Sequence, residues 1–323
     1  MLRVLFAGTP ECAVPSLEKV ARAHHVVAIL TNPATVQGRS GKLVSSPVAQ
    51  EAERLINEGL LPRDTPIITP KKITDSVREA IAATKPDILA CFAFGKIFGP
   101  KTLSLFPLGA INVHPSLLPR WRGCAPIPAT ILAQDTITGI TVQKMALEMD
   151  AGDILLTQTI DLDGSETTDS LLIRAADEGA QMLVQVLDGI VKNNIIPIPQ
   201  DHTKATFSSM LCKEDGEITW SDTAKNIDAR IRAFTSWPGA WTKTKDRTLI
   251  ILKAHIVQNN EDADLSTSPP GTVLGSDKKE GILVQTGKGI IALENLQWRT
   301  KKPLDWKSFL NGTRDFFGTV LGI

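Results

Sequence analysis

The chain has 323 residues, with 35 basic and 35 acidic side chains and therefore a formal net charge of zero. Apolar residues make up 42% of it and charged residues 22%, close to the globular average, which excludes collagen-like, disordered and low-complexity chains. No apolar run reaches the roughly 18 residues that a membrane span needs, and the N-terminus does not resemble a signal peptide. We therefore expect a cytoplasmic protein, without membrane contact, that folds as about two domains of roughly 150 residues each.

Cysteine and histidine usage argues against disulfides and metals. The four cysteines, Cys12, Cys91, Cys124 and Cys212, form no CxxC pair, so we expect buried, reduced thiols. The five histidines form no HxxxH or HExxH pattern. The sequence therefore predicts no metal site.

In the first part of the chain, apolar strands alternate with amphipathic helices, which is typical of βαβ units. Strands are expected at residues 2–7, 25–31, 87–93 and 110–113, followed by a strand pair at 139–145 and 154–160. Helices are expected at residues 12–22, 47–57 and 168–188. This order predicts a Rossmann-like α/β domain with a mostly parallel sheet. Ligands bind at the carboxyl ends of such strands, so the loops that start at Phe94 and His114 face the expected site.

Two segments of this part lack a regular pattern. Residues 32–46 are long for a connection between a strand and a helix and show no apolar periodicity, so we expect an irregular loop that is functional or mobile. Residues 191–209, which include Pro197 and Pro199, are interpreted as an interdomain linker. The expected domains are therefore residues 1–190 and 210–323.

The pattern after the linker changes to short alternating segments. Strands are expected at residues 240–245, 247–257, 271–274, 281–286 and 289–298. Five short strands in about 110 residues predict a small β-barrel of the OB type. The apolar run FTSWPGAW, residues 234–241, is interpreted as core of this domain.

The densest polar motif is NVHPSLLPRWRG at residues 112–123, beginning in a predicted strand. Residues two apart on a strand face the same side, so Asn112 and His114 project together. Asparagine offers a neutral N–H donor to a carbonyl that gains negative charge, and histidine moves protons near pH 7. These two residues alone leave a purely structural role open. Neither Gly8-Thr9-Pro10 nor residues 38–42 fit a dinucleotide or P-loop fingerprint.

Together with MDAGDIL at residues 149–155, this motif resembles the signature of the 10-formyltetrahydrofolate-dependent formyltransferases and hydrolases. The resemblance implies a catalytic set of Asn112, His114 and Asp150. It also implies a folate site bordered by Ser116, Leu117, Leu118, Pro119, Phe94 and Gly95. The family pattern has Tyr where this chain has Phe94, so no hydrogen bond is expected from that position.

The similarity extends over nearly the whole chain to the family members that formylate the methionine of charged initiator tRNA. It includes FAGTPE at residues 6–11, GRSGKLVSSPV at 38–48 and IRAFTSWPGAW at 231–241. It implies 10-formyltetrahydrofolate as the formyl donor, methionyl-initiator tRNA as the partner, no metal, and a loop that carries Arg39 and Lys42 toward the acceptor stem. We further expect a monomer. Basic residues of the second domain that are candidates for phosphate contacts are Lys243, Lys245, Arg247, Lys253, Arg299, Lys301 and Lys302.

The chemistry implied is direct attack of the α-amino group on the formyl carbon. Asn112 and His114 would stabilise the tetrahedral oxyanion, and Asp150 would hold His114 or relay protons. The sequence leaves open which of His114 and Asp150 moves each proton. It also leaves open a glycinamide ribonucleotide formyltransferase, a folate hydrolase, a sugar-nucleotide formyltransferase and a noncatalytic RNA-binding protein, of which the sugar-nucleotide enzymes are the nearest rival.

Overall fold

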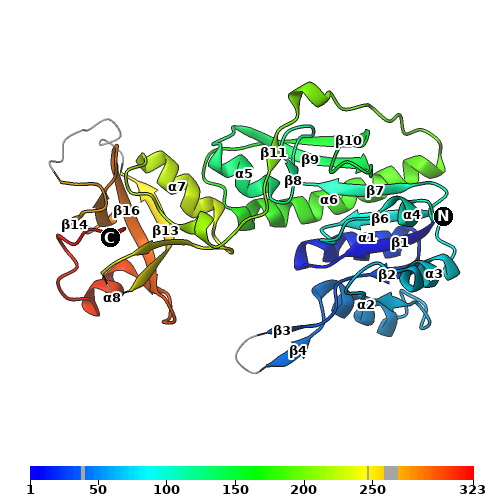
Figure 1. The fold of residues 1–323 in the computed structure, drawn as a ribbon, viewed down its shortest axis with the longest axis horizontal. Coiled ribbons are helices and arrows are strands. Elements are labelled where there is room, and N and C mark those ends of the chain that lie inside the picture. The colour runs from blue at the N-terminus through cyan, green and yellow to red at the C-terminus, as the bar shows by residue number, and fades with distance from the viewer. Residues whose placement is uncertain (38–40, 246, 258–267) are drawn as a thin grey trace. The chain divides into compact units, whose positions relative to one another are not determined.

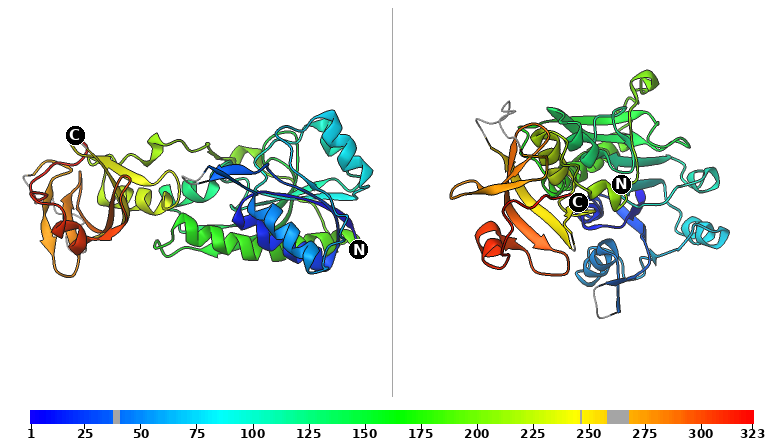
Figure 2. Two further views of the ribbon diagram at one scale, coloured as in Figure 1. Left: turned by 90° about the horizontal axis from the view of Figure 1, so that it is seen from below. Right: turned by 60° about the vertical axis from the view of Figure 1, so that its left-hand side comes forward.

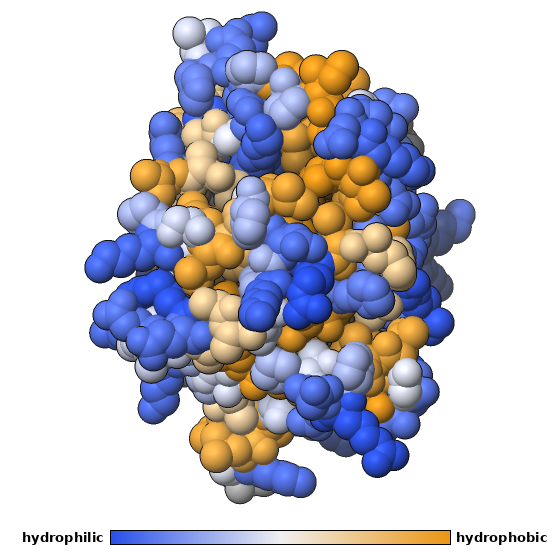
Figure 3. Space-filling model, turned by 90° about the vertical axis from the view of Figure 1, so that its right-hand side faces the viewer, coloured by the Kyte–Doolittle hydropathy of each residue, from blue (hydrophilic) through white to orange (hydrophobic). Residues whose placement is uncertain are grey.

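The computed structural model describes residues 1–37, 41–245, 247–257 and 268–323 of the chain (Figure 1). No helix within those ranges is long and apolar enough to cross a membrane. Hydrophobic and hydrophilic residues are interspersed on the face that Figure 3 shows. The contacts divide the chain into two compact units. The first comprises Met1–Pro126, Ile137–Asp161 and Leu171–Ser208, and the second comprises Ile127–Thr136, Leu162–Ser170 and Ser209–Ile323.

The first unit is built on a seven-stranded sheet in the order β10-β9-β7-β6-β1-β2-β5. Its parallel strands are β1 (Arg3–Gly8), β2 (His25–Leu30), β5 (Ile67–Ile68), β6 (Ile88–Phe92) and β7 (Ala110–His114). Strand β9 (Ile137–Lys144) pairs antiparallel with β7, and β10 (Ile154–Asp161) pairs antiparallel with β9. The predicted mostly parallel sheet is therefore confirmed. The sequence pattern missed β5, which has only two residues.

Helices cover both faces of this sheet (Figure 2). They are η1 (Glu11–Ala13), α1 (Val14–Ala23), α2 (Pro47–Asn57), α3 (Asp75–Ala83), α4 (Pro100–Leu103) and α6 (Thr168–Val191). An ion pair of 2.8 Å between Lys19 and Asp177 joins α1 to α6 on one face. On the other face Ile81 of α3 packs with Leu5 and Leu89 in a buried apolar cluster.

The two faces of β7 have different surroundings. Val113 faces α6, where Gly179 allows close packing because a Cβ there would lie 2.8 Å from Val113 Cγ1. The opposite face carries Asn112 and His114, and the register places Gln143 of β9 beside Asn112. A hydrogen bond of 3.2 Å from Leu118 N to Thr141 Oγ1 holds the loop after β7 against this second face, where Asn112 stays partly exposed. The polar motif therefore lies where a ligand can approach it.

Residues 32–46 are not the irregular loop that we expected. They contain an antiparallel hairpin of β3 (Thr35–Gln37) and β4 (Lys42–Val44), in which Val36 pairs with Leu43 (Figure 1). Three residues on each strand are too few for a period-2 pattern to be recognised. Lys42 is exposed on β4, whereas Arg39 lies outside the described residues.

The second unit contains an antiparallel sheet in the order β12-β13-β16-β15-β14, with β17 also paired to β16. Its strands are β12 (Ala240–Lys243), β13 (Thr248–Ile256), β14 (Val273–Asp277), β15 (Gly281–Gln285), β16 (Ile290–Trp298) and β17 (Leu304–Asp305). The five predicted strands are confirmed, and the OB-type topology stays a prediction. Two helices of this unit that follow the linker, α7 (Ala224–Ala233) and α8 (Trp306–Asn311), were not predicted.

The core of the second unit is apolar and includes the fully buried side chains of Leu249, Ile291 and Leu293. Phe234 and Ala240 are buried as predicted for the run at residues 234–241. The prediction is wrong for Trp237, which is 56% exposed. Residues 235–238 form bends between α7 and β12, and the Trp237 indole lies at the surface on them.

The segment after α6 runs along the first unit. Ile198 and Ile154 exchange two backbone hydrogen bonds of 2.8 and 2.9 Å. Further on, β11 (Phe207–Ser208) pairs in parallel with β8 (Arg122–Gly123). Most of the residues interpreted as a linker are therefore packed against the sheet unit that carries the polar motif.

All four cysteines are free. Cys12 and Cys91 are buried, and burial raises the pKa of Cys91 to about 12. The expectation of burial is wrong for Cys124 and Cys212, which are exposed because both lie in irregular connections outside the strands and helices. Spacing in the sequence carries no information on such exposure.

Candidate active site

The carboxyl ends of the central parallel strands meet around the backbone of Phe94. Thr9 Oγ1, after β1, and Asn32 Nδ2, after β2, donate to Phe94 O at 3.1 and 3.3 Å. The chain runs outward from β1 through β2 to β5 and then returns to β6 on the other side of β1. The reversal of strand order between β1 and β6 is where open α/β sheets bind ligands. The predicted site therefore lies at the carboxyl ends of the parallel strands, the edge of the sheet where such folds bind ligands.

His114 stands at the end of β7 and is 4% exposed. Its Nε2 lies 2.9 Å from the carbonyl oxygen of Trp121. A carbonyl oxygen only accepts, so Nε2 carries a hydrogen. In the neutral ring Nδ1 is then unprotonated, and it faces Asp150 Oδ2 at 3.7 Å. That distance is too long for a direct hydrogen bond but close enough for the charge of one group to act on the other.

Asp150 reaches His114 from a loop that doubles back. Strand β9 runs antiparallel to β7 and ends opposite Ile111, so residues 145–153 must return across the sheet. Asp150 itself has φ of +52°, in the sparsely populated left-handed region. Its Oδ2 accepts from Gly123 N at 2.8 Å, and its Oδ1 accepts from Gln143 Nε2 at 2.9 Å. Both carboxylate oxygens therefore have a fixed donor.

Asn112 shares the face of β7 with His114 and is half-buried. Within the described residues, its side-chain amide has no hydrogen-bond partner. The structure thus brings Asn112, His114 and Asp150 together with an amide N–H available to a substrate. Sequence reasoning missed Gln143 and the backbone of Gly123. Gln143 is identified by the strand register, which pairs it with Asn112 across β9 and β7.

The residues expected to border the folate lie at the same edge of the sheet as the catalytic cluster, but some of them are buried and others are exposed. Ser116 is buried, and its Oγ donates to Arg120 O at 2.6 Å. Leu118 is also buried, whereas Leu117 and Pro119 are partly exposed. Phe94 is buried and stacks on Phe98 with ring centroids 5.2 Å apart, while Gly95 is exposed with φ of +79°. The surface open to a ligand comes from Gly95, Leu117 and Pro119.

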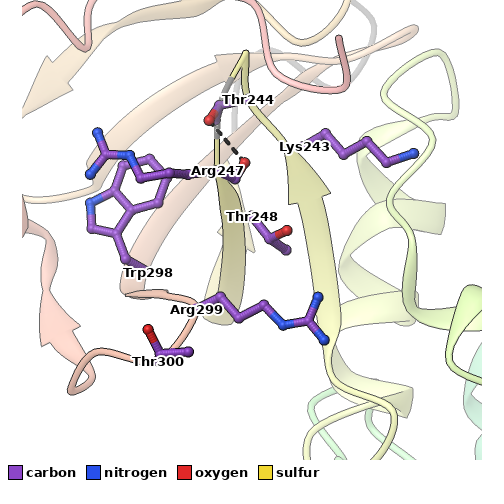
Figure 4. A pocket seen from close by; sticks show the side chains of 7 residues that line it. All are labelled: Lys243, Thr244, Arg247, Thr248, Trp298, Arg299 and Thr300. Carbon is purple, nitrogen blue, oxygen red and sulfur yellow. Dashed lines mark hydrogen bonds between the residues drawn. The ribbon is translucent and has the colours of Figure 1, made fainter.

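The second unit has a basic hollow of about 490 Å³ (Figure 4). The guanidinium of Arg247 lies 4.1 Å from the ring centroid of Trp298, and Lys243 forms a 2.9 Å ion pair with Glu217. The hollow is lined by Lys243, Thr244, Arg247, Thr248, Trp298, Arg299 and Thr300. The other basic residues singled out in the sequence are also exposed but lie outside it: Lys245, Lys253, Lys301 and Lys302.

Among the residues that the structure describes, no three His, Cys, Asp or Glu side chains are grouped so that they could hold a metal ion. The site is therefore a cluster of an amide, an imidazole and a carboxylate at the carboxyl edge of an α/β sheet. Such a set stabilises an oxyanion and moves protons. These are the catalytic groups of an enzyme that transfers a group through attack on a carbonyl carbon.

Comparison with known proteins defines the family. The family model described as formyl transferase matches residues 2–187, and the one described as formyl transferase, C-terminal domain, matches residues 210–314. This chain belongs to the formyl transferase family.

Similar proteins include full-length relatives. A methionyl-tRNA formyltransferase of Treponema pallidum (strain Nichols) is 51% identical over 100% of both chains. One from Treponema denticola is 49% identical over 98% of both. Among solved structures, an N-formyltransferase of Helicobacter canadensis in complex with folinic acid and dTDP-3-aminofucose aligns with a TM-score of 0.65 at 20% identity, covering 91% of this chain and 99% of that one. That last likeness supports the fold.

Proposed function

We propose that this protein transfers the formyl group of 10-formyltetrahydrofolate to the α-amino group of methionyl-initiator tRNA. The observation that carries the proposal is the convergence of Asn112, His114 and Asp150 at one sheet edge, with His114 Nδ1 3.7 Å from Asp150 Oδ2. Full-length relatives at 51% and 49% identity that bear the name of this activity support it.

The reaction begins with the amine. An α-amino group has an ordinary pKa of about 7.7–8.0, so a substantial fraction is neutral near neutral pH and attacks the formyl carbon. A bond forms between the amine nitrogen and this carbon, and the carbonyl oxygen becomes an oxyanion. The side-chain N–H of Asn112 donates to that oxygen. The bond from the formyl carbon to N10 of the folate then breaks as a proton passes from the former amine to N10.

His114 and Asp150 form the proton-handling pair. Because Nε2 of His114 donates to Trp121 O, the ring exchanges protons through Nδ1, which faces Asp150 Oδ2. The pair accepts the proton that the attacking amine loses and returns one to N10. The folate lies along the exposed backbone of Gly95 and beside Leu117 and Pro119, which are the open parts of the predicted folate border.

The tRNA is bound mainly through its phosphates. Lys42 on the β3–β4 hairpin, together with Arg39 beyond the described residues, contacts the acceptor stem. The hollow of the second unit adds Lys243, Arg247 and Arg299, and none of the described residues that line it carries a carboxylate. Cations that neutralise phosphates release counterions, so this part of the affinity falls with salt.

The same proposal covers organisation and location. A catalytic domain of residues 1–190, a connecting segment of residues 191–209 and a tRNA-binding barrel domain of residues 210–323 agree with family matches that end at residue 187 and begin again at residue 210. The enzyme acts as a cytoplasmic monomer. Light scattering on the purified protein tests the monomer, and fractionation of cells tests the location.

The decisive experiment incubates the purified protein with 10-formyltetrahydrofolate and methionine-charged initiator tRNA. Charged elongator tRNA, a UDP-amino-sugar and water alone serve as parallel acceptors. Formylmethionine on the initiator alone is the expected result. Turnover confined to the sugar or to water would keep the catalytic cluster and refute the tRNA assignment, while tRNA binding without any turnover would identify a noncatalytic RNA-binding protein.

A further inference from the structure

A chain of buried polar side chains runs from Arg122 to Asp150. Arg122 and Gln143 are each 1% exposed and Gln200 is 5% exposed, although all three side chains are strongly polar. Arg122 belongs to β8, Gln143 belongs to β9, and Gln200 comes from the segment after α6. Groups buried to this degree require hydrogen-bond partners of the correct polarity, and here they supply them to one another.

The guanidinium of Arg122 sets the polarity of the next residue. It has donors and no acceptor, so the Gln200 amide must turn its oxygen toward it. Gln200 Oε1 lies 3.1 Å from Arg122 Nε and 2.8 Å from Nη2. Gln200 Nε2 therefore points the other way and donates to the backbone oxygens of Gly152 at 2.6 Å and Asp150 at 2.9 Å. These two bonds hold the Asp150 loop against the segment after α6.

The same polarity passes to Gln143. Gln200 Nε2 also lies 3.3 Å from Gln143 Oε1, which must be the acceptor of that contact. The Gln143 Nε2 is then the atom that faces Asp150 Oδ1, at 2.9 Å. If this amide were reversed, its oxygen would meet the carboxylate oxygen and its nitrogen would meet the Gln200 nitrogen. Both contacts would be repulsive, so the arrangement has one favourable orientation.

We propose that Gln143 is a positioning residue for the formyl transfer and that Gln200 and Arg122 fix the orientation of its amide. This inference rests on the proposed function. Gln143 donates to Oδ1 of Asp150 while Gly123 N donates to Oδ2, so the plane of the carboxylate is fixed with Oδ2 toward His114. Gln200 lies between the two family matches, in a segment that neither of them covers.

Two substitutions remove the donor in different ways. Gln143→Met keeps the length of the side chain and removes its N–H groups. Gln200→Glu keeps an acceptor for Arg122 and removes the donor that orients Gln143. Each is expected to lower kcat by about 10- to 100-fold, the scale of losses from small misplacements of catalytic groups, with KM for both substrates close to that of the wild type. Gln158→Met, at an exposed position on β10, is the matched control and keeps the wild-type kcat.

The double variant tests the orienting chain itself. Once Gln143 has no amide, Gln200 can no longer orient it. The kcat of the double variant is therefore expected to be close to that of the less active single variant. A structural role for each residue alone predicts losses that multiply. Multiplying losses, or a folded Gln143→Met variant with normal kcat, would overturn the proposal.

The pH profile supplies a readout that packing does not move. Gln143→Glu places a second carboxylate beside that of Asp150, and two such groups in contact share a proton at pH values where one alone is ionised. The acid limb of the kcat profile is expected to move to higher pH in Gln143→Glu and to stay in place in Gln158→Glu. Identical limbs in the wild type and Gln143→Glu would contradict the assignment.

A measurement without substrates separates this proposal from the function on which it rests. Melting temperatures of the wild type, the two single variants and the double variant are compared by calorimetry. Non-additive melting temperatures support the orienting chain even if the wild-type protein transfers no formyl group, an outcome that would refute the proposed function. Wild-type transfer combined with additive melting temperatures and unchanged kcat would refute the positioning role alone.

Discussion

The two units of the protein use polar side chains in opposite ways. In the first unit Arg122, Gln143 and Gln200 are buried and each holds a partner in a fixed direction. In the second unit the cations around Trp298 are exposed and lie on a sheet whose interior is apolar. A buried polar group left without its partner costs about 1–3 kcal/mol, whereas an exposed ion pair contributes about 0–1 kcal/mol. Single substitutions therefore impair chemistry in the first unit, while binding in the second is spread over several charges.

The largest effect is expected at Asn112. Asn112→Ala removes the amide donor to the oxyanion and should lower kcat by about 10²- to 10³-fold, since one such donor contributes this much elsewhere. Transfer of formyl groups is measured at saturating folate and tRNA. Asn57→Ala, at an exposed position on α2, is the control with unchanged kcat. Near-normal turnover by a folded Asn112→Ala protein would contradict the conclusion that single substitutions in the first unit impair the chemistry.

The second unit has its own sensitive part, which is the apolar interior. Leu293 on β16 is fully buried, and Leu293→Ala should lower the free energy of unfolding by about 2–5 kcal/mol through lost burial and a cavity. Denaturant titration monitored by tryptophan fluorescence measures it. Leu304→Ala, at an exposed position on β17, should cost much less. Equal losses at the two positions would show that burial does not explain the stability of this unit.

A smaller and salt-dependent effect is expected at the basic hollow. The double variant Arg247→Ala/Arg299→Ala should bind methionyl-initiator tRNA more weakly at low salt and reduce the slope of log Kd against log salt by about 2, one for each lost phosphate contact. Fluorescence anisotropy over a salt series measures the slope. Arg54→Ala, at an exposed position on α2, is the control for the loss of one surface guanidinium outside the hollow. An unchanged slope would show that the hollow does not bind tRNA. The kcat of the double variant is expected to equal that of the wild type.

The smallest effect is a pH dependence of stability at His255. Partial burial of this imidazole opposes its charge, but hydrogen bonds to Glu280 and Glu294, of 2.6 and 2.9 Å, outweigh burial and raise its pKa above the ordinary 6.5. The folded form binds the proton more tightly, so the added stability is complete below pH 6.5 and is lost as pH rises through the raised pKa. The melting temperature of His255→Gln should therefore fall below that of the wild type at about pH 6 and approach it at about pH 9. A constant difference would exclude this titration.

Local signals in the sequence account for much of the first unit. The helix predicted at residues 47–57 is α2, and the Ser46 hydroxyl caps its start by accepting from Ala49 N at 3.1 Å. Asn112 and His114 share a face because they are two apart on a strand, which the pattern alone predicts. Asp150 was predicted only from the resemblance to a known family, because a residue with left-handed backbone conformation in a loop that doubles back has no local sequence signature.

The rest of the site depends on contacts between distant parts of the chain. Gln143 faces Asp150 only because β9 pairs antiparallel with β7 in one register, and Gln200 reaches both from a segment without periodicity. The exposure of Trp237 likewise goes with the bends at residues 235–238, between α7 and β12, rather than with composition. Such features follow from the three-dimensional pairing, which a single sequence does not contain.

The position of Gln200 in the chain has a consequence for biosynthesis. A ribosome adds residue 187, where the first family match ends, before it adds the amide that orients Gln143 or the β11 residues that pair with Arg122 and Gly123. At about 5–20 residues per second, the nascent chain carries Asn112, His114 and Asp150 for about 2.5–10 seconds before Gln200 is added. A shortened enzyme intended to retain this chemistry must therefore extend to Ser208.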